Sequence, residues 1–224
     1  NTQRLHQDKR ALRLVLREQG SSLSMAEVEE VQKHLSQLNA QTEKTAQLSF
    51  LKGIDHLLLQ DLGAAISALT EAIERDPSFT LAYYARSIAS LRRSEAERGR
   101  PVEQPAPSTP QVRAAATGAK GTTSAELPLP APTPTRVVEY SPLTDLNQVI
   151  TQAPTFAFAY YNRANLYAKT GDVERAKQDY TKAIELNPLF AESYFNRGLL
   201  YYSEGKVKEG TRDLSRAGEL GLYK

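Results

Sequence analysis

Residues 157–190 read AFAYYNRANLYAKTGDVERAKQDYTKAIELNPLF, and residues 191–224 read AESYFNRGLLYYSEGKVKEGTRDLSRAGELGLYK. The two segments have the same length and align without a gap. The aligned pairs include Tyr160 with Tyr194, Asn162 with Asn196, Arg163 with Arg197, Tyr167 with Tyr201, Gly171 with Gly205 and Ala183 with Ala217. A fixed period of this kind is typical of proteins that stack copies of one supersecondary unit.

Each unit has the pattern of two helices joined by a turn. In the first unit, Tyr160 and Tyr167 share a helical face with the small residue Ala164 between them. Gly171 marks the turn, and Pro188 ends the second helix. Small or apolar residues also recur at helical spacing in the second half: Ala176, Tyr180 and Ala183.

This unit resembles the tetratricopeptide repeat (TPR), a helix–turn–helix of the same length with small residues at positions 8, 20 and 27 and proline at position 32. The resemblance implies an all-α, right-handed solenoid of antiparallel helix pairs. Residues 46–79 fit the same pattern, with Gly53, Ala65, Ala72 and Pro77 at those four positions. We therefore expect TPR 1 at 46–79, and the two aligned units above are TPR 3 and TPR 4.

The spacing of the terminating prolines shows that one repeat is longer than the others. Pro154 and Pro188 lie one period apart, as do the two aligned units, but the interval from Pro77 to Pro154 exceeds one period by 43 positions. We therefore expect TPR 2 over residues 80–156, with a proline-rich disordered insertion at 98–140. Counting back from the terminator predicts a second helix at about 142–152, because Leu146 and Val149 then stand at positions 24 and 27.

The composition of the insertion allows three interpretations. Residues 98–140 are rich in Pro, Ala, Thr, Ser and Gly, and contain one aromatic residue, so they cannot bury enough apolar surface to offset the entropy of ordering. The segment is a tolerated surface excursion, a docking segment for a partner, or a boundary between two domains. If it lies inside one repeat, a protease that cuts between about residues 99 and 135 should leave the two fragments associated.

The region before TPR 1 predicts a single capping helix over residues 24–39. Ser24 and Glu27 form a capping box, in which the hydroxyl and the carboxylate each satisfy a free backbone N–H. An apolar stripe follows, made by Val28, Val31, Leu35 and Leu38. Residues 1–23 are expected to be extended or irregular.

Composition and motifs favour no catalytic or metal chemistry. The formal net charge is +2 and there is no cysteine, so a nucleic-acid partner is not expected and a thiolate site is excluded. Glu30 and His34 are one helical turn apart, but a solvated charge pair explains them better than a metal site. His56 is expected in the core or at its edge. We expect no enzyme, no cofactor and no membrane insertion by this segment.

The TPR resemblance implies instead a partner-binding concave face, formed by the first helix of each repeat. At position 5 each first helix carries an aromatic residue, and aromatic rows offer large contact area with few rotamers to freeze. The expected partner-binding residues are Phe50, Ile54, Leu81, Tyr84, Ile88, Phe158, Tyr161, Asn162, Asn165, Phe195, Asn196 and Leu199. Alternatively, some of these rings pack between neighbouring repeats.

One known TPR chemistry, a clamp of Lys, Arg and Asn for a C-terminal carboxylate, fits this sequence poorly. Asn162 and Asn165 match two clamp-like positions, but Tyr161 stands where a lysine is needed, and Glu192 and Asn196 stand where the next repeat needs cations. An acidic C-terminal tail is therefore not the expected ligand.

These patterns predict a non-catalytic protein–protein interaction scaffold that binds a peptide or helix. Two alternatives stay open: a regulatory or docking region of a larger enzyme or assembly complex, and a nucleic-acid-binding solenoid. The closing residues AGELGLYK resemble TPR proteins of Gram-negative bacteria. That resemblance favours a periplasmic or envelope-associated location, although the sequence itself does not fix the compartment.

Overall fold

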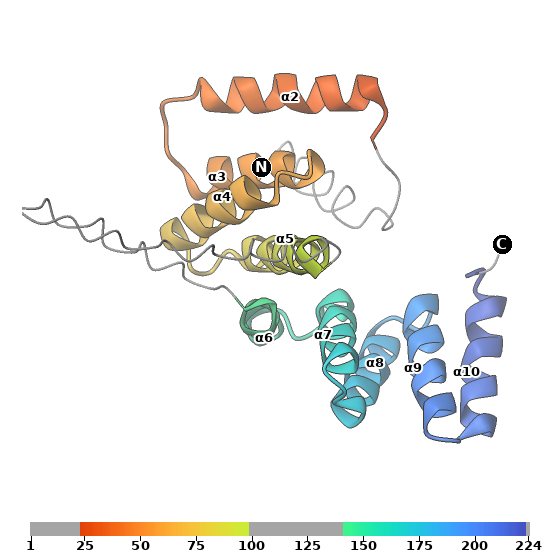
Figure 1. The fold of residues 1–224 in the computed structure, drawn as a ribbon. Helices are drawn as coiled ribbons and strands as arrows, with labels where there is room; N and C mark the ends of the chain where they lie inside the picture. The colour runs from red at the N-terminus through yellow and green to blue at the C-terminus, as the bar shows by residue number, and fades with distance from the viewer. Residues whose placement is uncertain (1–22, 99–140, 223–224) are drawn as a thin grey trace, which may run out of the picture.

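The computed structural model describes residues 23–98 and 141–222, and within these ranges it contains helices and no strands. In chain order the helices are α2 (Met25–Asn39), α3 (Ala46–Leu58), α4 (Leu62–Arg75), α5 (Thr80–Arg98), α6 (Pro142–Gln152), α7 (Ala157–Lys169), α8 (Val173–Leu186), α9 (Ala191–Ser203) and α10 (Val207–Glu219). From α3 onward each helix packs against the next one, and the pairs stack into an elongated solenoid (Figure 1). The expected all-α solenoid of helix pairs is confirmed. The segments expected at 1–23 and 98–140 fall outside the described residues, except for Leu23 and Arg98.

The turn inside three of the helix pairs depends on one residue with a left-handed backbone. At position 15 of the repeat, φ is +61° at Gln60, +81° at Gly171 and +75° at Gly205. Glycine adopts this conformation without strain because it has no Cβ. In the interrupted repeat the same position is Ser94, which lies inside α5 because this helix continues to Arg98. The chain therefore leaves α5 after 19 helical residues, whereas α3, α7 and α9 each have 13.

The core lies between the two helices of each pair, where small residues allow close approach. Ala65, Leu69 and Ala72 on α4 have no exposed surface. A Cβ on Gly53 of α3 would lie 2.5 Å from Leu69 Cγ, so this helix pair approaches more closely than any larger residue allows. The same fully buried pattern recurs on the other second helices, at Leu146, Val149, Ala176, Ala183 and Ala217.

An arginine–aspartate pair joins the two helices of each of the last three pairs. The arginine stands at position 7 and donates from Nε and Nη2 to both carboxylate oxygens of the aspartate at position 23. The pairs are Arg86–Asp145, Arg163–Asp179 and Arg197–Asp213, with N–O distances between 2.7 and 2.9 Å. The partners are 59 residues apart in the first pair and 16 in the other two, so the first separation is longer by the length of the insertion. Helix α6 is therefore paired with α5 in the same way as α8 is paired with α7.

The N-terminal helix α2 lies across α3 at one end of the solenoid (Figure 1). It begins at the expected capping box: Ser24 Oγ accepts from the Glu27 backbone N–H at 3.3 Å, and Glu27 Oε2 accepts from the Ser24 N–H at 2.9 Å. Leu38 is the buried residue of this helix. A bond between His34 Nδ1 and Asp55 Oδ2, 2.7 Å long, links the helix to α3. The attachment of α2 thus combines a small apolar contact with this polar one.

Replacing Ser193 with alanine is expected to raise the free energy of unfolding by about 1 kcal/mol. Ser193 is fully buried and its Oγ has no hydrogen-bond partner within the described residues, so the hydroxyl is desolvated without compensation. Ala82 and Ala159 fill the same position in the two preceding repeats and are also fully buried. Urea unfolding followed by circular dichroism measures the change.

The matched control is Ser87→Ala. Ser87 is equally buried, but its Oγ donates to the Tyr84 carbonyl at 2.6 Å, so its removal should cost about 0.5–1.5 kcal/mol. If Ser193→Ala destabilised the protein as Ser87→Ala does, the hydroxyl of Ser193 would not be an uncompensated group in the folded state.

Candidate functional site

The expected partner-binding residues all lie on the first helices α3, α5, α7 and α9, and we call their common surface the first-helix face. They differ in exposure. Four are buried: Phe50 (2% exposed), Ile54 (3%), Tyr84 (2%) and Asn162 (8%). The others keep accessible surface, and these are Leu81, Ile88, Phe158, Tyr161, Asn165, Phe195, Asn196 and Leu199. The accessible part of the face therefore lies mainly on α5, α7 and α9.

Three of the aromatic residues at position 5 pack against an aromatic residue at position 34 of the same repeat. The ring pairs are Phe50–Phe79, Tyr84–Phe156 and Tyr161–Phe190, with centroids 4.7, 4.9 and 4.7 Å apart. Position 34 lies in the loop that leads into the next repeat, so each pair closes a junction between repeats. This role of the position-34 rings was not predicted from the sequence, although they recur two residues after each terminating proline.

Asparagine side chains at position 6 bind the tyrosine at position 5 of the preceding repeat. Asn162 Nδ2 donates to Tyr84 Oη at 3.0 Å, and Asn196 Nδ2 donates to Tyr161 Oη at 3.4 Å. Burial raises the pKa of both phenols, so they stay protonated and keep their hydroxyl protons for further bonds. Each tyrosine is thus fixed in place by a ring on one side and an amide on the other.

Asn165 connects this network to the second helix of its own repeat. Its Oδ1 accepts from Tyr180 Oη at 2.5 Å and from Asn196 Nδ2 at 3.1 Å. With both bonds made, Asn165 is held in one orientation while part of its side chain stays accessible. The amide is therefore a rigid polar group on a mostly apolar face.

The position-7 arginines also join neighbouring repeats, a role that was not predicted from the sequence. The third donor of each guanidinium, Nη1, reaches the side-chain oxygen at position 25 of the preceding repeat. These bonds are Arg86 to Thr70 Oγ1 (3.1 Å), Arg163 to Asn147 Oδ1 (2.8 Å) and Arg197 to Thr181 Oγ1 (2.9 Å). The hydrogen bonds that Arg163 donates to Asp179 raise the pKa of this arginine. The signal was present in the sequence as an arginine, an aspartate and an oxygen-bearing residue, each recurring with the period of the repeat.

The described residues contain no metal-binding arrangement. Within residues 23–98 and 141–222, no group of three or more His, Asp or Glu side chains is arranged so that it could hold a metal ion. His34 binds Asp55, 21 residues away on α3, and this partner was not expected. His56 is half-buried, with Nδ1 3.5 Å from Asp61 Oδ2. In the same ranges no helix combines the length and the apolar character needed to cross a bilayer.

The amino-acid sequence was compared with models of known protein families and matches three of them. Family models described as tetratricopeptide repeats match residues 50–111, 157–190 and 179–210. No curated protein sequence matches the chain.

Three solved structures illustrate the likeness in fold. MamA from Desulfovibrio magneticus RS-1 is 16% identical, with a TM-score of 0.60 over 100% of this chain and 96% of that chain. The TPR protein YrrB is 11% identical, with a TM-score of 0.58 over 89% of this chain and 82% of that chain. A tetratricopeptide repeat protein from Parabacteroides merdae ATCC 43184 is 17% identical, with a TM-score of 0.54 over 81% of this chain and 56% of that chain. At these identities the likeness shows the fold alone, and the family models, which together match just over half of the chain, show that it belongs to the tetratricopeptide repeat family.

Proposed function

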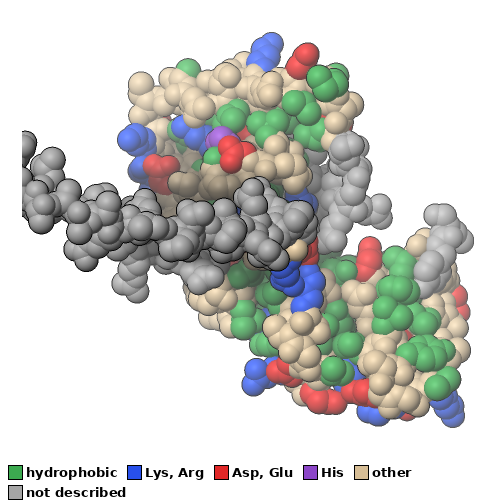
Figure 2. Space-filling model, in the orientation of Figure 1, with side chains coloured by type: hydrophobic (Ala, Val, Ile, Leu, Met, Phe, Trp, Pro, Cys, Tyr) green, Lys and Arg blue, Asp and Glu red, His purple; other side chains and the backbone are tan. Residues whose placement is uncertain are grey.

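We propose that this protein is a non-catalytic scaffold whose first-helix face binds an extended peptide or a helix of a partner protein. The observation that carries the proposal is a set of large apolar side chains on successive first helices that are only partly buried. Leu81 and Ile88 lie on α5, Phe158 and Tyr161 on α7, and Leu199 on α9. Figure 2 shows hydrophobic side chains gathered over the half of the molecule that contains α7–α10. The expected concave face is the surface that these helices share.

The way in which this set is supported favours binding. Phe158 packs between Phe156 and Phe190, with ring centroids 5.9 and 4.9 Å away. Tyr161 is held by Asn196 and by the Phe190 ring. Side chains that are fixed before binding lose little entropy when a partner covers them. The buried members of the expected set, such as Tyr84, therefore act as supports, and the accessible members are proposed to make the contacts.

The class of ligand follows from the same residues. Accessible rings and aliphatic chains next to the amide of Asn165 suit an apolar peptide segment that offers a backbone group for hydrogen bonding. YrrB, which shares the fold, is described as a TPR protein with an unusual peptide-binding site, and this supports a peptide as the ligand. No part of the proposal requires a catalytic group.

Replacing Ile88 and Phe158 together with alanine is expected to weaken partner binding at least about tenfold. The reason is that truncating large side chains at the centre of an interface commonly costs more than about 1 kcal/mol each. Photo-cross-linking from residue 158, followed by mass spectrometry of the captured peptides, identifies a partner, and a binding titration with that partner measures the change.

The matched control is Leu189→Ala with a photo-cross-linker at residue 189. Leu189 is 70% exposed and lies in the loop before α9, outside this set. We expect no change in affinity there and no cross-link to the same partner. Equal cross-linking from residues 158 and 189, with the fold of both variants intact by circular dichroism, would argue against the first-helix face as the binding surface.

A further inference from the structure

Two cationic side chains occupy the same repeat position at one edge of the first-helix face. Arg92 on α5 and Lys169 on α7 both stand at position 13. Arg92 lies four residues after Ile88, and Lys169 lies four residues after Asn165, so each cation is one helical turn beyond a residue of the expected binding set. The part of the face formed by α5 and α7 therefore has a basic edge.

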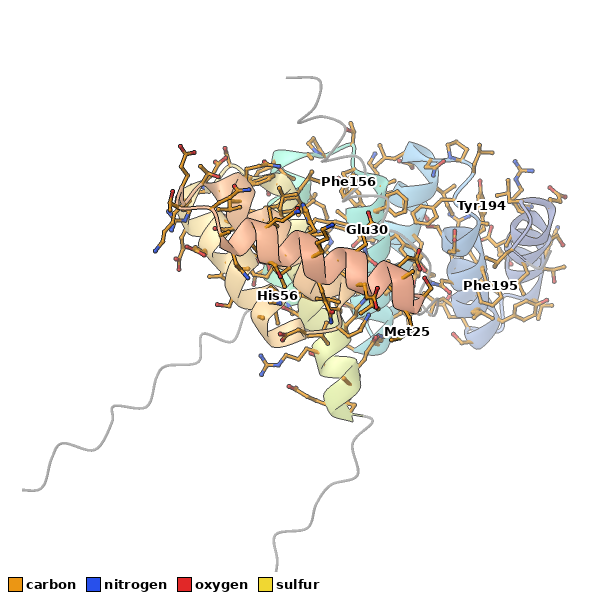
Figure 3. All side chains as sticks on the ribbon, turned by 90° about the horizontal axis from the view of Figure 1, so that it is seen from above. Met25, Glu30, His56, Phe156, Tyr194 and Phe195 are labelled. Carbon is orange, nitrogen blue, oxygen red and sulfur yellow. The ribbon has the colours of Figure 1, made fainter. Side chains whose placement is uncertain are left out.

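The length of α5 brings a carboxylate to the same edge. α5 continues past position 13 to Arg98, and Figure 3 shows its yellow-green end projecting beyond the neighbouring helices. Glu95 lies on this extra part and forms an ion pair with Lys169 of α7. The charge of Glu95 also reaches Arg92, but Arg92 makes no hydrogen bond or ion pair with any residue that the structure describes. Two cations therefore share one carboxylate, and Lys169 holds it.

Arg92 is partly removed from water and has no hydrogen-bond acceptor among the described residues. Its side chain is partly buried, and this burial lowers the pKa of the guanidinium, an effect that the nearby Glu95 and Tyr84 only partly oppose. The arginines at position 7, by contrast, each donate two hydrogen bonds to an aspartate. A guanidinium in the state of Arg92 gains charge-assisted hydrogen bonds when a carboxylate reaches it, and it has less hydration left to lose.

We propose that Arg92 and Lys169 form a subsite of the first-helix face that binds an aspartate or glutamate side chain of the partner peptide. The inference rests on the proposed function and adds one charged feature to an otherwise apolar ligand. Arg92 lies about 6 Å along α5 from Ile88, and side chains two residues apart on an extended peptide are separated by about 6.5 Å. The expected ligand therefore has an acidic residue two positions from an apolar one. In the complex two cations face two carboxylates, so the charges at the subsite balance.

The first test selects peptides from a random library displayed on phage, with the whole chain as the bait. Each displayed peptide is joined to the coat protein at its C-terminal end, so an enriched carboxylate belongs to a side chain. The unchanged chain is expected to enrich an apolar residue with Asp or Glu two positions away. The double variant Arg92→Gln, Lys169→Gln should keep the apolar preference and lose the acidic one. A chain that enriched apolar residues alone would contradict only this inference, and one that enriched neither kind would contradict the proposed function as well.

The second test measures the binding of one enriched peptide, amidated at its C-terminus, by fluorescence anisotropy. Replacing its acidic residue with the corresponding amide should weaken binding to the unchanged chain about five- to twentyfold and should leave binding to the double variant unchanged. Glu95→Gln should act in the opposite direction, because it releases Lys169 and removes a nearby negative charge. The acidic peptide is expected to bind this variant about two- to fivefold more tightly, and a loss of folding could not produce such a gain.

The matched control is Arg93→Gln, which removes the same charge from the next residue of α5. Arg93 is exposed and already forms an ion pair with Glu97, so the affinity for the acidic peptide should not change.

Three outcomes would overturn the inference. They are equal enrichment of acidic residues by the unchanged chain and the double variant, weaker binding of the acidic peptide to Glu95→Gln, and tight binding of the amide peptide once its C-terminal carboxylate is free. The last outcome would mean that the two cations bind the end of a chain and not a side chain.

Discussion

Asp145→Ala is expected to lower the free energy of unfolding by about 3–5 kcal/mol. Asp145 and Arg86 are 2% and 6% exposed and form a two-bond ion pair at 2.7 and 2.8 Å. Removing the carboxylate takes the counter-charge away from a guanidinium that stays buried beside Thr70, and a buried charge that has lost its counter-charge is costly. Urea denaturation followed by circular dichroism gives the change. The size of the effect reflects the charge left behind rather than the net strength of the pair.

A double variant separates these two contributions. Arg86→Met combined with Asp145→Leu removes both charges and keeps apolar volume, so it should recover much of the stability that Asp145→Ala loses. Glu71→Ala is the matched control for an exposed pair, because Glu71 and Arg75 are half-exposed on one helix, and it should cost less than about 1 kcal/mol. If Asp145→Ala cost no more than Glu71→Ala, the buried pair would not hold α6 against α5.

The fold could be predicted because its main determinant is the regular spacing at which residue types recur in the sequence. This spacing can be recognised without knowing which distant residues are in contact. The repeat period places small residues at helix–helix contacts, such as Ala164 and Ala183, and both are fully buried. The extra length between Pro77 and Pro154 predicted α6, which starts at Pro142 as expected. The capping box at Ser24 likewise predicted the start of α2, because its two bonds are local in sequence.

Whether each residue of the first-helix face is buried or accessible could not be predicted from the repeat period. Phe50, Tyr84 and Tyr161 look equivalent in the sequence, but the structure buries the first two and leaves the third partly accessible. The difference comes from how the neighbouring helix and loop cover each ring, which depends on packing between repeats. The period marks a position as aromatic and does not say whether its ring faces a partner or the next repeat.

The contact between His34 and Asp55 was beyond prediction for a related reason. His34 lies on α2 and Asp55 on α3, and no local sequence pattern specifies the path of the loop that connects these two helices. Burial raises the pKa of Asp55, and the nearby His34 opposes this change. Such a bond becomes visible only when the packing of α2 on α3 is known.

Cutting the chain between α5 and α6 is expected to leave one particle, and adding Asp145→Ala is expected to let the fragments separate. A specific protease site placed after Gly118 divides the chain between the two helices of the interrupted pair. Their contact includes Leu146 and Val149, which are fully buried, in addition to the ion pair with Arg86. A loss of about 3–5 kcal/mol corresponds to a dissociation constant about 100- to several-thousandfold higher.

Size-exclusion chromatography with light scattering, over a dilution series of the cut protein, measures the association. One control is the uncut Asp145→Ala chain, in which the two halves stay covalently joined. The other is Glu185→Ala in the cut chain, because the Lys182–Glu185 pair is exposed and its loss should not affect association. Fragments of the otherwise unchanged cut protein that separated at micromolar concentration would mean that the two halves are independent domains. Fragments that stay together until Asp145 is replaced would mean that residues on either side of the insertion form one repeat, held across the gap by the same arginine–aspartate pair that joins the uninterrupted repeats.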